Sequence, residues 1–280
     1  MAVNYATKYA SKIAKAFTLG SLTEAAVNKE FDWVGTEAIK VFGITTQALA
    51  NYDKSATSNR YGTPSELQNV VQTMTLAKDR AFSISIDRYT LESTNGAVKA
   101  GEVLKMEIDE QITPEIDAYR LDKMQDAAIG NGHVEVAAVT TSNAYKVFLD
   151  GQEVLGDAKV PVKGRVAFIS YDYLGKIKQD STFMLASEVA MNERINGMVG
   201  MVDGVKLVPV PSSYLPANVA FILTHPSATV AAEKLSEYNI RTNVQGFSGV
   251  VIEGRVIYDA FVIDQKVDAI YVHATAEISA

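Results

Sequence analysis

Cysteine is absent from the 280 residues of the chain. Its absence excludes disulfide bonds, thiolate metal ligands and a cysteine nucleophile. The composition fits folding in a reducing cytoplasm but does not require it. Any assembly that the protein builds must therefore be held together by other means.

Long apolar runs and export signals are also missing. Apolar stretches such as 219–223 are far shorter than the roughly 18 to 20 residues that a membrane span needs. The N-terminal sequence MAVNYATKYASKIAKAF has no continuous apolar region and no clear small-residue cleavage site. We therefore expect a soluble protein without a secretory signal and without a membrane partner.

Motifs for catalysis or cofactor binding are equally scarce. The three histidines, His133, His225 and His273, are far apart in sequence and lack HExxH spacing, so no metal site is predicted. The glycines of NGMVGMVDG (196–204) do not follow the GxGxxG order, and no GxxxxGKS/T loop is present. Ser248 in GFSGV lacks the second spacer of a GxSxG elbow. The sequence predicts no cofactor, no metal and no catalytic residue.

Positive charge is in deficit. Acidic residues outnumber basic ones by 33 to 26, which gives a formal net charge of -7 and a pI near 5.1. Such a surface tends to repel phosphate, so dedicated nucleic-acid binding is disfavoured. The chain is nevertheless 48% hydrophobic and long enough to bury a sizeable core, in one large domain or two closely joined ones.

The N-terminal segment shows a helical pattern. Tyr5, Tyr9, Ile13 and Phe17 recur every four residues, and lysines 8, 12 and 15 are offset from them. This spacing predicts a short amphipathic helix. Two interpretations stay open: the helix packs on its own domain, or it is a mobile arm that docks on a neighbouring subunit or faces cargo.

A β-hairpin with a wide polar tip is predicted next. The segment 31–44 is strand-like, 51–63 is polar, and 70–87 favours strand. Phe82, Ile84 and Ile86 alternate with polar residues in the second arm, as in a strand that is apolar on one face. An isolated two-stranded ribbon is marginal in water, so this one is expected to lie on its own chain or on another subunit.

A long amphipathic helix follows from about residue 94. Leu104, Ile108, Ile112 and Ile116 are spaced by four and predict a buried stripe. Pro114 falls inside this pattern, so the helix either kinks there or restarts with Thr113 as its cap. The carboxylates between the apolar positions indicate a solvated face rather than a metal or acid-base cluster, because no histidine joins them at ligand spacing.

Helices and strands then alternate after the loop at 130–132. Ser142 can cap a helix that reaches Leu155, and Ser170 can cap another through Ile177. Ser227 can open a third helix, through Leu235. The remaining segments predict strands at 164–170, 205–210, 219–224, 250–252, 255–263 and 269–274, with turns at 253–254 and 265–268.

The order of these pieces resembles the major capsid proteins of tailed phages with the Hong Kong 97-type fold, especially those of phages and prophages of Gram-positive bacteria. Five stretches carry the resemblance, and together they span nearly the whole chain: NRYGTPSELQNVVQTMTLAKDRAFSISIDR (59–88), EIDEQITPEIDAYRLDKM (107–124), VKGRVAFISYDYLGKIKQDSTF (162–183), INGMVGMVDGVKLVPVPSSYLP (195–216) and VIEGRVIYDAFVIDQKVDAIYV (251–272). None of them is a catalytic signature, so the specificity lies in their order and combined coverage.

The resemblance implies an α+β capsid fold in four parts. These are an N-arm at 1–30, an extended hairpin called the E-loop at 31–88, a peripheral domain with a long spine helix at 89–134 and 256–280, and an axial α/β domain at 135–255. It also implies contacts with neighbouring subunits through the N-arm and the E-loop tip. The residues expected to make them are Tyr5, Tyr9, Ile13, Phe17, Tyr52, Lys54, Arg60 and Tyr61.

The function that the resemblance implies is structural. Subunits would form pentamers and hexamers of an icosahedral shell that encloses double-stranded DNA without reading its sequence. Scaffold and portal proteins would be partners, and the shell would assemble in the bacterial host cytoplasm before residing in the virion. The acidic balance fits, since a shell that bound DNA tightly would hinder its release.

Two features of some family members are not carried over. Some have a long scaffolding or protease-cleaved segment at the N-terminus, whereas this chain begins almost at the arm, so any scaffold is expected to be separate or the sequence to be mature. Others join subunits by a lysine to asparagine isopeptide bond. Lys54 lies near the predicted tip, but no motif identifies an acceptor, and a solvated lysine is the favoured interpretation.

Two alternatives remain at the level of sequence. An encapsulin-like compartment would share the fold but enclose a protein cargo, and neighbouring genes would distinguish it from a phage protein. An α/β enzyme of another type would have a concave pocket with shifted titratable groups and would be a stable monomer or small oligomer.

Overall fold

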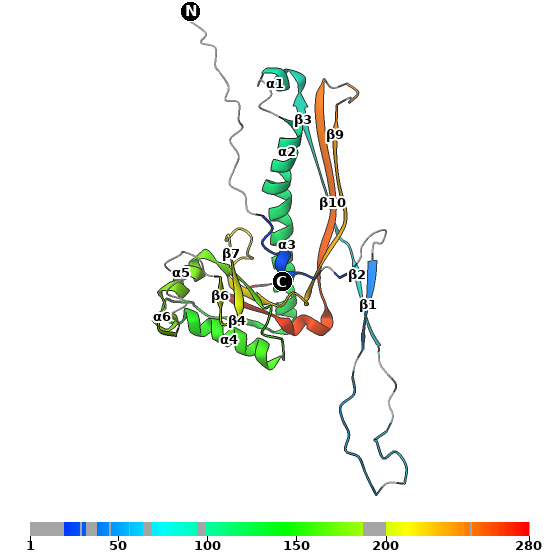
Figure 1. Cartoon of the computed structure of the whole chain (residues 1–280), viewed down its shortest axis with the longest axis vertical. Helices are drawn as coiled ribbons and strands as arrows, with labels where there is room; N and C mark the ends of the chain where they lie inside the picture. The colour runs from blue at the N-terminus through cyan, green and yellow to red at the C-terminus, as the bar shows by residue number, and fades with distance from the viewer. Residues whose placement is uncertain are drawn as a thin grey trace, which may run out of the picture.

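The computed structural model describes residues 20–28, 30–31, 38–44, 46–55, 57–63, 66, 69–93, 99–186, 200–242, 244–246 and 248–279. Figure 1 shows an elongated molecule in which a long helix stands beside a tall, narrow sheet. A two-stranded hairpin extends from the lower end of this sheet, and a second body of strands and helices lies on the other side of the helix.

The hairpin is formed by β1 (Ala38–Ile44) and β2 (Asn69–Thr75), which pair antiparallel with Ala38 opposite Thr75. The predicted second arm, 70–87, is wrong as a single piece. The chain leaves the hairpin after β2, and β3 (Lys78–Asp87) pairs with another strand of the tall sheet. The alternation in β3 is confirmed, because positions 82, 84 and 86 are more buried than their neighbours.

The tall sheet has the strand order β3-β10-β9, with β9 (Thr229–Arg241) and β10 (Gly249–Val262) both antiparallel to their neighbours. The predicted helix from Ser227 to Leu235 is wrong, because strand pairing with β10 overrides the local helical pattern. The residues before β9 form a turn instead, in which the Ala228 N–H donates to the carbonyl of His225 at 2.9 Å.

The predicted turn at 253–254 is also wrong, since β10 continues through it. Gly254 lies opposite Phe82 of β3 and Tyr238 of β9. A Cβ atom at this position would collide with both aromatic rings. Glycine is therefore needed here for close packing of rings across the sheet, which is a different reason from a turn.

The long helix consists of α2 (Ala100–Glu107), the π-helical turn η2 (Ile108–Ile112) and α3 (Thr113–Asn131), and we call it the spine helix. Thr113 does not cap a restarted helix: it is helical, and its N–H donates to the carbonyl of Ile108 five residues back. The wider π turn lies immediately before Pro114, whose ring would crowd the carbonyl of residue 110 in a regular α-helix. Gly132, with φ at 72°, ends the helix.

The apolar stripe predicted on this helix is only partly correct. Leu104, Ile108, Ile112 and Ile116 are half-buried, and no residue of α2 or η2 is fully buried. Full burial begins in α3, where Leu121, Met124 and Ala128 pack against the second body. The upper half of the spine helix therefore contributes little core within one subunit.

The second body contains a six-stranded sheet of order β4-β11-β8-β5-β7-β6. Its strands are β4 (Val134–Val136), β5 (Val166–Ser170), β6 (Met201–Val202), β7 (Val205–Val210), β8 (Val219–Thr224) and β11 (Ile270–Ala274). The spine helix covers one face, and helices α4 (Ala144–Asp157), α5 (Tyr171–Gln179) and α6 (Ser181–Ala186) lie at the other. The strands predicted at 205–210 and 219–224 are confirmed.

The helix caps of this body divide into one correct and one wrong prediction. Ser170 caps α5, because its Oγ accepts a hydrogen bond of 3.2 Å from the Tyr173 N–H. Ser142 does not cap α4, whose N-cap residue is Asn143. The buried N–H of Tyr145 in the first turn of α4 instead donates to Asp180, which follows α5, at 3.0 Å.

The domain assignment itself stays a prediction, but the end of the chain runs through both sheets. The boundary between residues 255 and 256 falls within β10, and β11 joins the six-stranded sheet instead of the tall one. Between them, the predicted turn at 265–268 lies in the 3-10 helix η3 (Asp264–Ala269). Two further short helices, η1 (Glu24–Ala26) and α1 (Arg88–Ser93), complete the described elements.

Candidate assembly surfaces

The tip of the hairpin presents an ordered pair of aromatic rings to solvent. Tyr52 and Tyr61 pack edge to face with their centroids 5.0 Å apart. A backbone hydrogen bond of 3.0 Å from the Asp53 N–H to the Arg60 carbonyl closes the tip between them. Lys54 and Arg60 are exposed on the same tip. The structure thus brings together four of the eight predicted contact residues, and whether they touch a neighbour stays a prediction.

The other four predicted contact residues lie in the N-terminal segment. Tyr5, Tyr9, Ile13 and Phe17 are outside the described residues. The described chain starts beside the spine helix, where Asp117 accepts hydrogen bonds from Ser21 Oγ at 2.8 Å and from the Leu22 N–H at 2.7 Å. The point at which the N-terminal segment joins the body is therefore fixed by a buried carboxylate.

One face of the hairpin is apolar and uncovered. In β1, Ile39 and Val41 turn inward and join a small core with Met74, Val230 and Ile263. Phe42 and Ile44 turn outward and are 69% and 58% exposed. Val71, which lies opposite Phe42 on β2, is also exposed. Adjacent exposed apolar side chains on a two-stranded ribbon are typical of a surface that another chain covers.

Phe42 and Ile44 were not among the predicted contact residues, because the prediction concentrated on the polar tip. The signal was present in AIKVFGI (38–44), where apolar residues occupy both alternating faces instead of one. A two-stranded ribbon that is apolar on both faces can bury only one of them on its own chain when it projects from the body. Reading both faces of the run would have identified Phe42 and Ile44.

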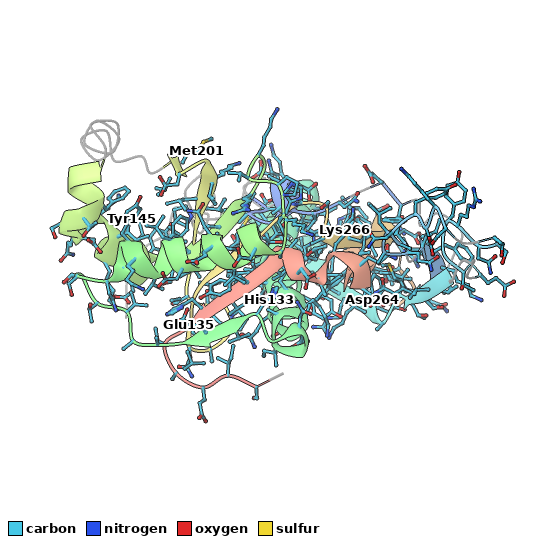
Figure 2. The ribbon with its side chains drawn as sticks, turned by 90° about the horizontal axis from the view of Figure 1, so that it is seen from below. His133, Glu135, Tyr145, Met201, Asp264 and Lys266 are labelled. Atoms are coloured by element: carbon cyan, nitrogen blue, oxygen red, sulfur yellow. The ribbon has the colours of Figure 1, made fainter. Side chains whose placement is uncertain are left out.

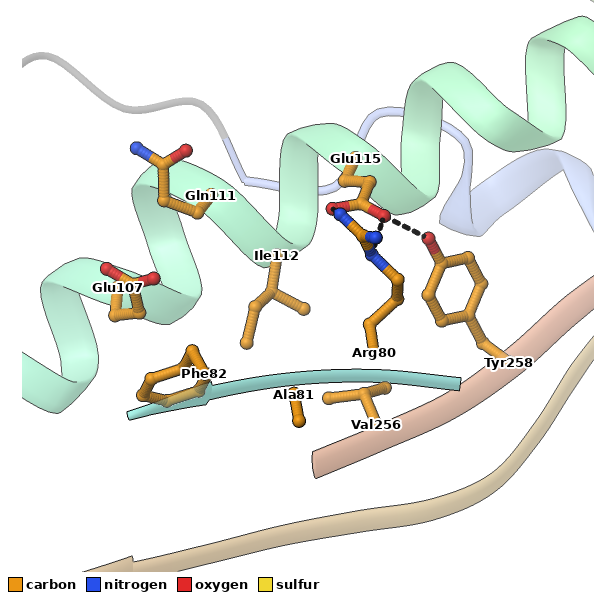
Figure 3. Close-up of a pocket in the computed structure, with 9 residues that line it drawn as sticks. All are labelled: Arg80, Ala81, Phe82, Glu107, Gln111, Ile112, Glu115, Val256 and Tyr258. Carbon is orange, nitrogen blue, oxygen red and sulfur yellow. Dashed lines mark hydrogen bonds and ion pairs between the residues drawn. The ribbon is translucent and has the colours of Figure 1, made fainter. Parts of the chain in front are cut away.

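A groove runs between the spine helix and the tall sheet (Figure 3). It encloses about 310 Å³, with Ile112, Phe82 and Val256 as its apolar walls. At one end Glu115 pairs with Arg80 at 2.8 Å and accepts a hydrogen bond of 2.8 Å from the Tyr258 hydroxyl. Burial, followed by this hydrogen bond, raises the pKa of Tyr258. Arg80 and Tyr258 thus both have Glu115 as their partner.

The histidines occupy three unrelated places. His273 is fully buried, its ring stacks on Phe221 with centroids 5.4 Å apart, and its Nε2 lies 3.0 Å from the Ala137 carbonyl. His225 contacts Ser227 through Nδ1 at 2.9 Å. His133 lies near Asp268 of η3, the helix that carries the labelled Asp264 and Lys266 in Figure 2.

These surroundings bear on metal and membrane binding. Within the described ranges, no three histidine or carboxylate side chains gather at a point where they could hold a metal ion. Likewise, none of the described helices is long and apolar enough to cross a membrane. The absence of metal sites and cofactors stays a prediction from sequence.

Comparison of the structure with solved structures finds full-length likeness to phage proteins. A structure titled "Mycobacterium phage Che8" is 15% identical with a TM-score of 0.77, and 98% of each chain is covered. The capsid structure of the cyanophage P-SCSP1u is 11% identical with a TM-score of 0.77, over 98% of this chain and 94% of the other. The mature capsid of bacteriophage PhiM1 is 12% identical with a TM-score of 0.72, over 97% and 92%.

The likeness is one of structure. No protein-family model and no curated protein matches the sequence. At 11 to 15% identity, the comparisons establish the fold alone. That fold is the mixed helix-and-sheet fold of phage capsid structures, as the resemblance in sequence implied.

Proposed function

We propose that the chain is the major capsid protein of a tailed phage, and that its copies assemble as pentamers and hexamers into an icosahedral shell. The proposal rests on how much of each chain the structural likeness covers. The likeness to the cyanophage and PhiM1 capsid structures extends over 97 to 98% of this chain and 92 to 94% of theirs, so it includes the projecting hairpin as well as the two sheets. A shared core with different appendages would not give this coverage.

The hairpin supports a second copy of the chain as its partner. Phe42, Ile44 and the aromatic tip expose apolar surface that one subunit does not cover. Burial of apolar surface contributes about 25 cal/mol per Å², so a neighbour that covered this face would be bound favourably. We propose that Tyr52, Lys54, Arg60 and Tyr61 meet the neighbour first and that Phe42 and Ile44 extend the contact.

The two sheets support an assignment of domain roles. We propose the hairpin 38–75 as the E-loop, and the spine helix with the tall sheet as the peripheral domain. The six-stranded body, including β11, is then the axial domain, and residues 1–30 are the N-arm. This assignment keeps the four parts that the sequence resemblance implies and moves their boundaries to the ends of observed strands.

The role is structural, and we propose no enzyme activity. The net charge of -7 supports a shell that encloses DNA without binding it tightly. Scaffold and portal proteins are the further partners we propose, with assembly in the host cytoplasm and a final location in the virion. The phage origin of the compared structures favours this role over an encapsulin-like compartment.

The test is assembly of the purified chain, alone and with its scaffold partner. Negative-stain images and light scattering are expected to show shells, tubes, or discrete pentamers and hexamers. A compact 30.3 kDa monomer at high concentration under both conditions would contradict the proposal.

A further inference from the structure

The carboxylate of Asp259 joins three elements at the root of the hairpin. It lies on β10 and is 5% exposed. Its Oδ2 accepts a hydrogen bond of 2.8 Å from the N–H of Ala77, in the link between β2 and β3. Its Oδ1 accepts one of 2.8 Å from the Tyr119 hydroxyl on the spine helix, and another of 2.8 Å from the Ala260 N–H.

A carboxylate is suited to this position because all three neighbours are donors. An ionised aspartate only accepts, whereas an asparagine in the same place would direct an amide N–H at one of those donors. Tyr119 is itself held in place, since the ammonium groups of Lys78 and Lys123 lie 4.9 and 5.7 Å from its ring centroid. These contacts restrict where the Tyr119 hydroxyl can lie.

A second tether lies further along the same strand. The Gln72 side chain donates from Nε2 to the Val262 carbonyl at 2.8 Å and accepts from the Asp264 N–H at 3.1 Å. Gln72 belongs to β2, so the hairpin is attached to the body both at its end, through Ala77, and within its strand. These two attachment points supplement the apolar contacts that Ile39, Val41 and Met74 make with the body, and together they restrict the direction of the hairpin.

We propose that Asp259 is a positioning residue that sets the direction of the hairpin relative to the spine helix. A second copy of the chain would then meet the hairpin in that direction. The identity of this partner rests on the proposed function, whereas the direction of the hairpin is a property of the single subunit and can be measured without assembly.

The absence of cysteine permits the measurement. Spin labels attached to Lys40→Cys on β1 and Lys105→Cys on the spine helix, both exposed positions, report the distance between hairpin and helix in the unassembled full chain. In the otherwise native protein we expect one narrow distance distribution. In Asp259→Asn we expect a distribution at least twice as wide, while circular dichroism stays native.

Tyr119→Phe and Asp79→Asn complete the test. Tyr119→Phe removes only the hydroxyl donor, is expected to widen the distribution less, and decides the matter should Asp259→Asn fail to fold. Asp79→Asn breaks an exposed ion pair with Arg255 on the same sheet and is expected to leave the distribution unchanged. Unchanged widths in the first two variants overturn the proposal, and so does equal widening in all three.

Assembly gives a separate readout. If the native chain assembles, the Asp259→Asn variant is expected to give particles of at least twofold wider size distribution, because its hairpins meet neighbours at varied angles. Should the native chain remain monomeric, the proposed function fails while the distance measurement still decides the role of Asp259.

Discussion

Asp117, inside the spine helix, accepts a hydrogen bond of 2.5 Å from the hydroxyl of Thr23, 94 residues earlier in the chain. Asp117 and Thr23 are both fully buried. Arg120 completes the arrangement by donating from Nη1 to Thr23 Oγ1 at 3.0 Å. A buried carboxylate is costly unless hydrogen bonds and charge satisfy it, so the segment at 21–23 and the spine helix stabilise one another.

Replacing Asp117 with alanine is therefore expected to destabilise the subunit by about 3 to 5 kcal/mol, because the Leu22 N–H and the Thr23 hydroxyl lose their acceptor and the buried Arg120 loses a carboxylate 4.0 Å away. Chemical denaturation measures the free energy of unfolding. Asp122→Asn, at an exposed position one turn further along, is the matched control and should change it by less than about 0.5 kcal/mol. If both variants lose the same free energy of unfolding, the hydrogen bonds of Asp117 contribute no more to stability than an exposed carboxylate does.

Replacing glycine by alanine is expected to have opposite effects on stability at two positions. Gly254→Ala is expected to cost about 1 to 3 kcal/mol, because the new Cβ collides with the rings of Phe82 and Tyr238. Gly101→Ala should instead stabilise the subunit by about 0.5 to 1 kcal/mol, since this helical position is exposed and open. Melting temperatures of the two variants should therefore shift in opposite directions. A shift of both in the same direction would contradict this account of β10.

His273 makes stability depend on pH. Burial lowers the pKa of its imidazole below the ordinary value of 6.5, with the Ala137 hydrogen bond and Glu135 acting in the opposite sense. The unfolded chain then binds a proton more readily than the folded one, so stability that is present above about pH 6.5 is lost as pH falls below it.

A variant without a titrating group isolates this effect. His273→Gln keeps an N–H that can donate to the Ala137 carbonyl but does not ionise. Its melting temperature at pH 8 is expected to be lower than that of the native protein, and the gap should narrow between pH 6.5 and 5. A gap that stays constant over this range would exclude His273 as the source.

The local patterns of the second body could be predicted from sequence because its segments are short and their neighbours bury them completely. β8 is an apolar run from Val219 to Leu223 that ends in Thr224, and every residue of it is buried. The strands of the tall sheet were harder to predict from the sequence. The residues of β9 favour a helix by local signals, and only pairing with the 14 residues of β10 makes them a strand.

The candidate surfaces likewise contain features that the sequence predicts and features that it does not. The polar character of the tip at 51–63 was predictable from composition, whereas Tyr52 and Tyr61 as contact residues were implied by the resemblance to the capsid family and stay a prediction. Asp117 and Asp259 were not, because their partners are 94 and 182 residues away and no spacing rule connects them. Ile112 shows the converse error, since helical periodicity marked it as core although the facing sheet leaves a groove beside it.

The two faces of the hairpin should respond differently to substitution. Met74 lies on the inner face and is 1% exposed, so Met74→Ser should cost about 2 to 5 kcal/mol of subunit stability. Phe42 lies on the outer face, so Phe42→Ser should change the melting temperature of the unassembled subunit little. If a second copy covers Phe42, the same variant should lose much of its tendency to assemble.

Deletion of the tip from 52 to 61 extends this comparison. Those residues are exposed wherever they are described, so the shortened subunit should keep its circular dichroism and melting temperature but assemble poorly. Sedimentation velocity and electron microscopy report the assembly. If the shortened chain unfolds, the tip is part of the subunit's core. If both the Phe42→Ser variant and the deletion form normal shells, the hairpin makes no contact that assembly needs. Loss of assembly with retained stability in both variants requires that the hairpin is buried by another copy and not by its own.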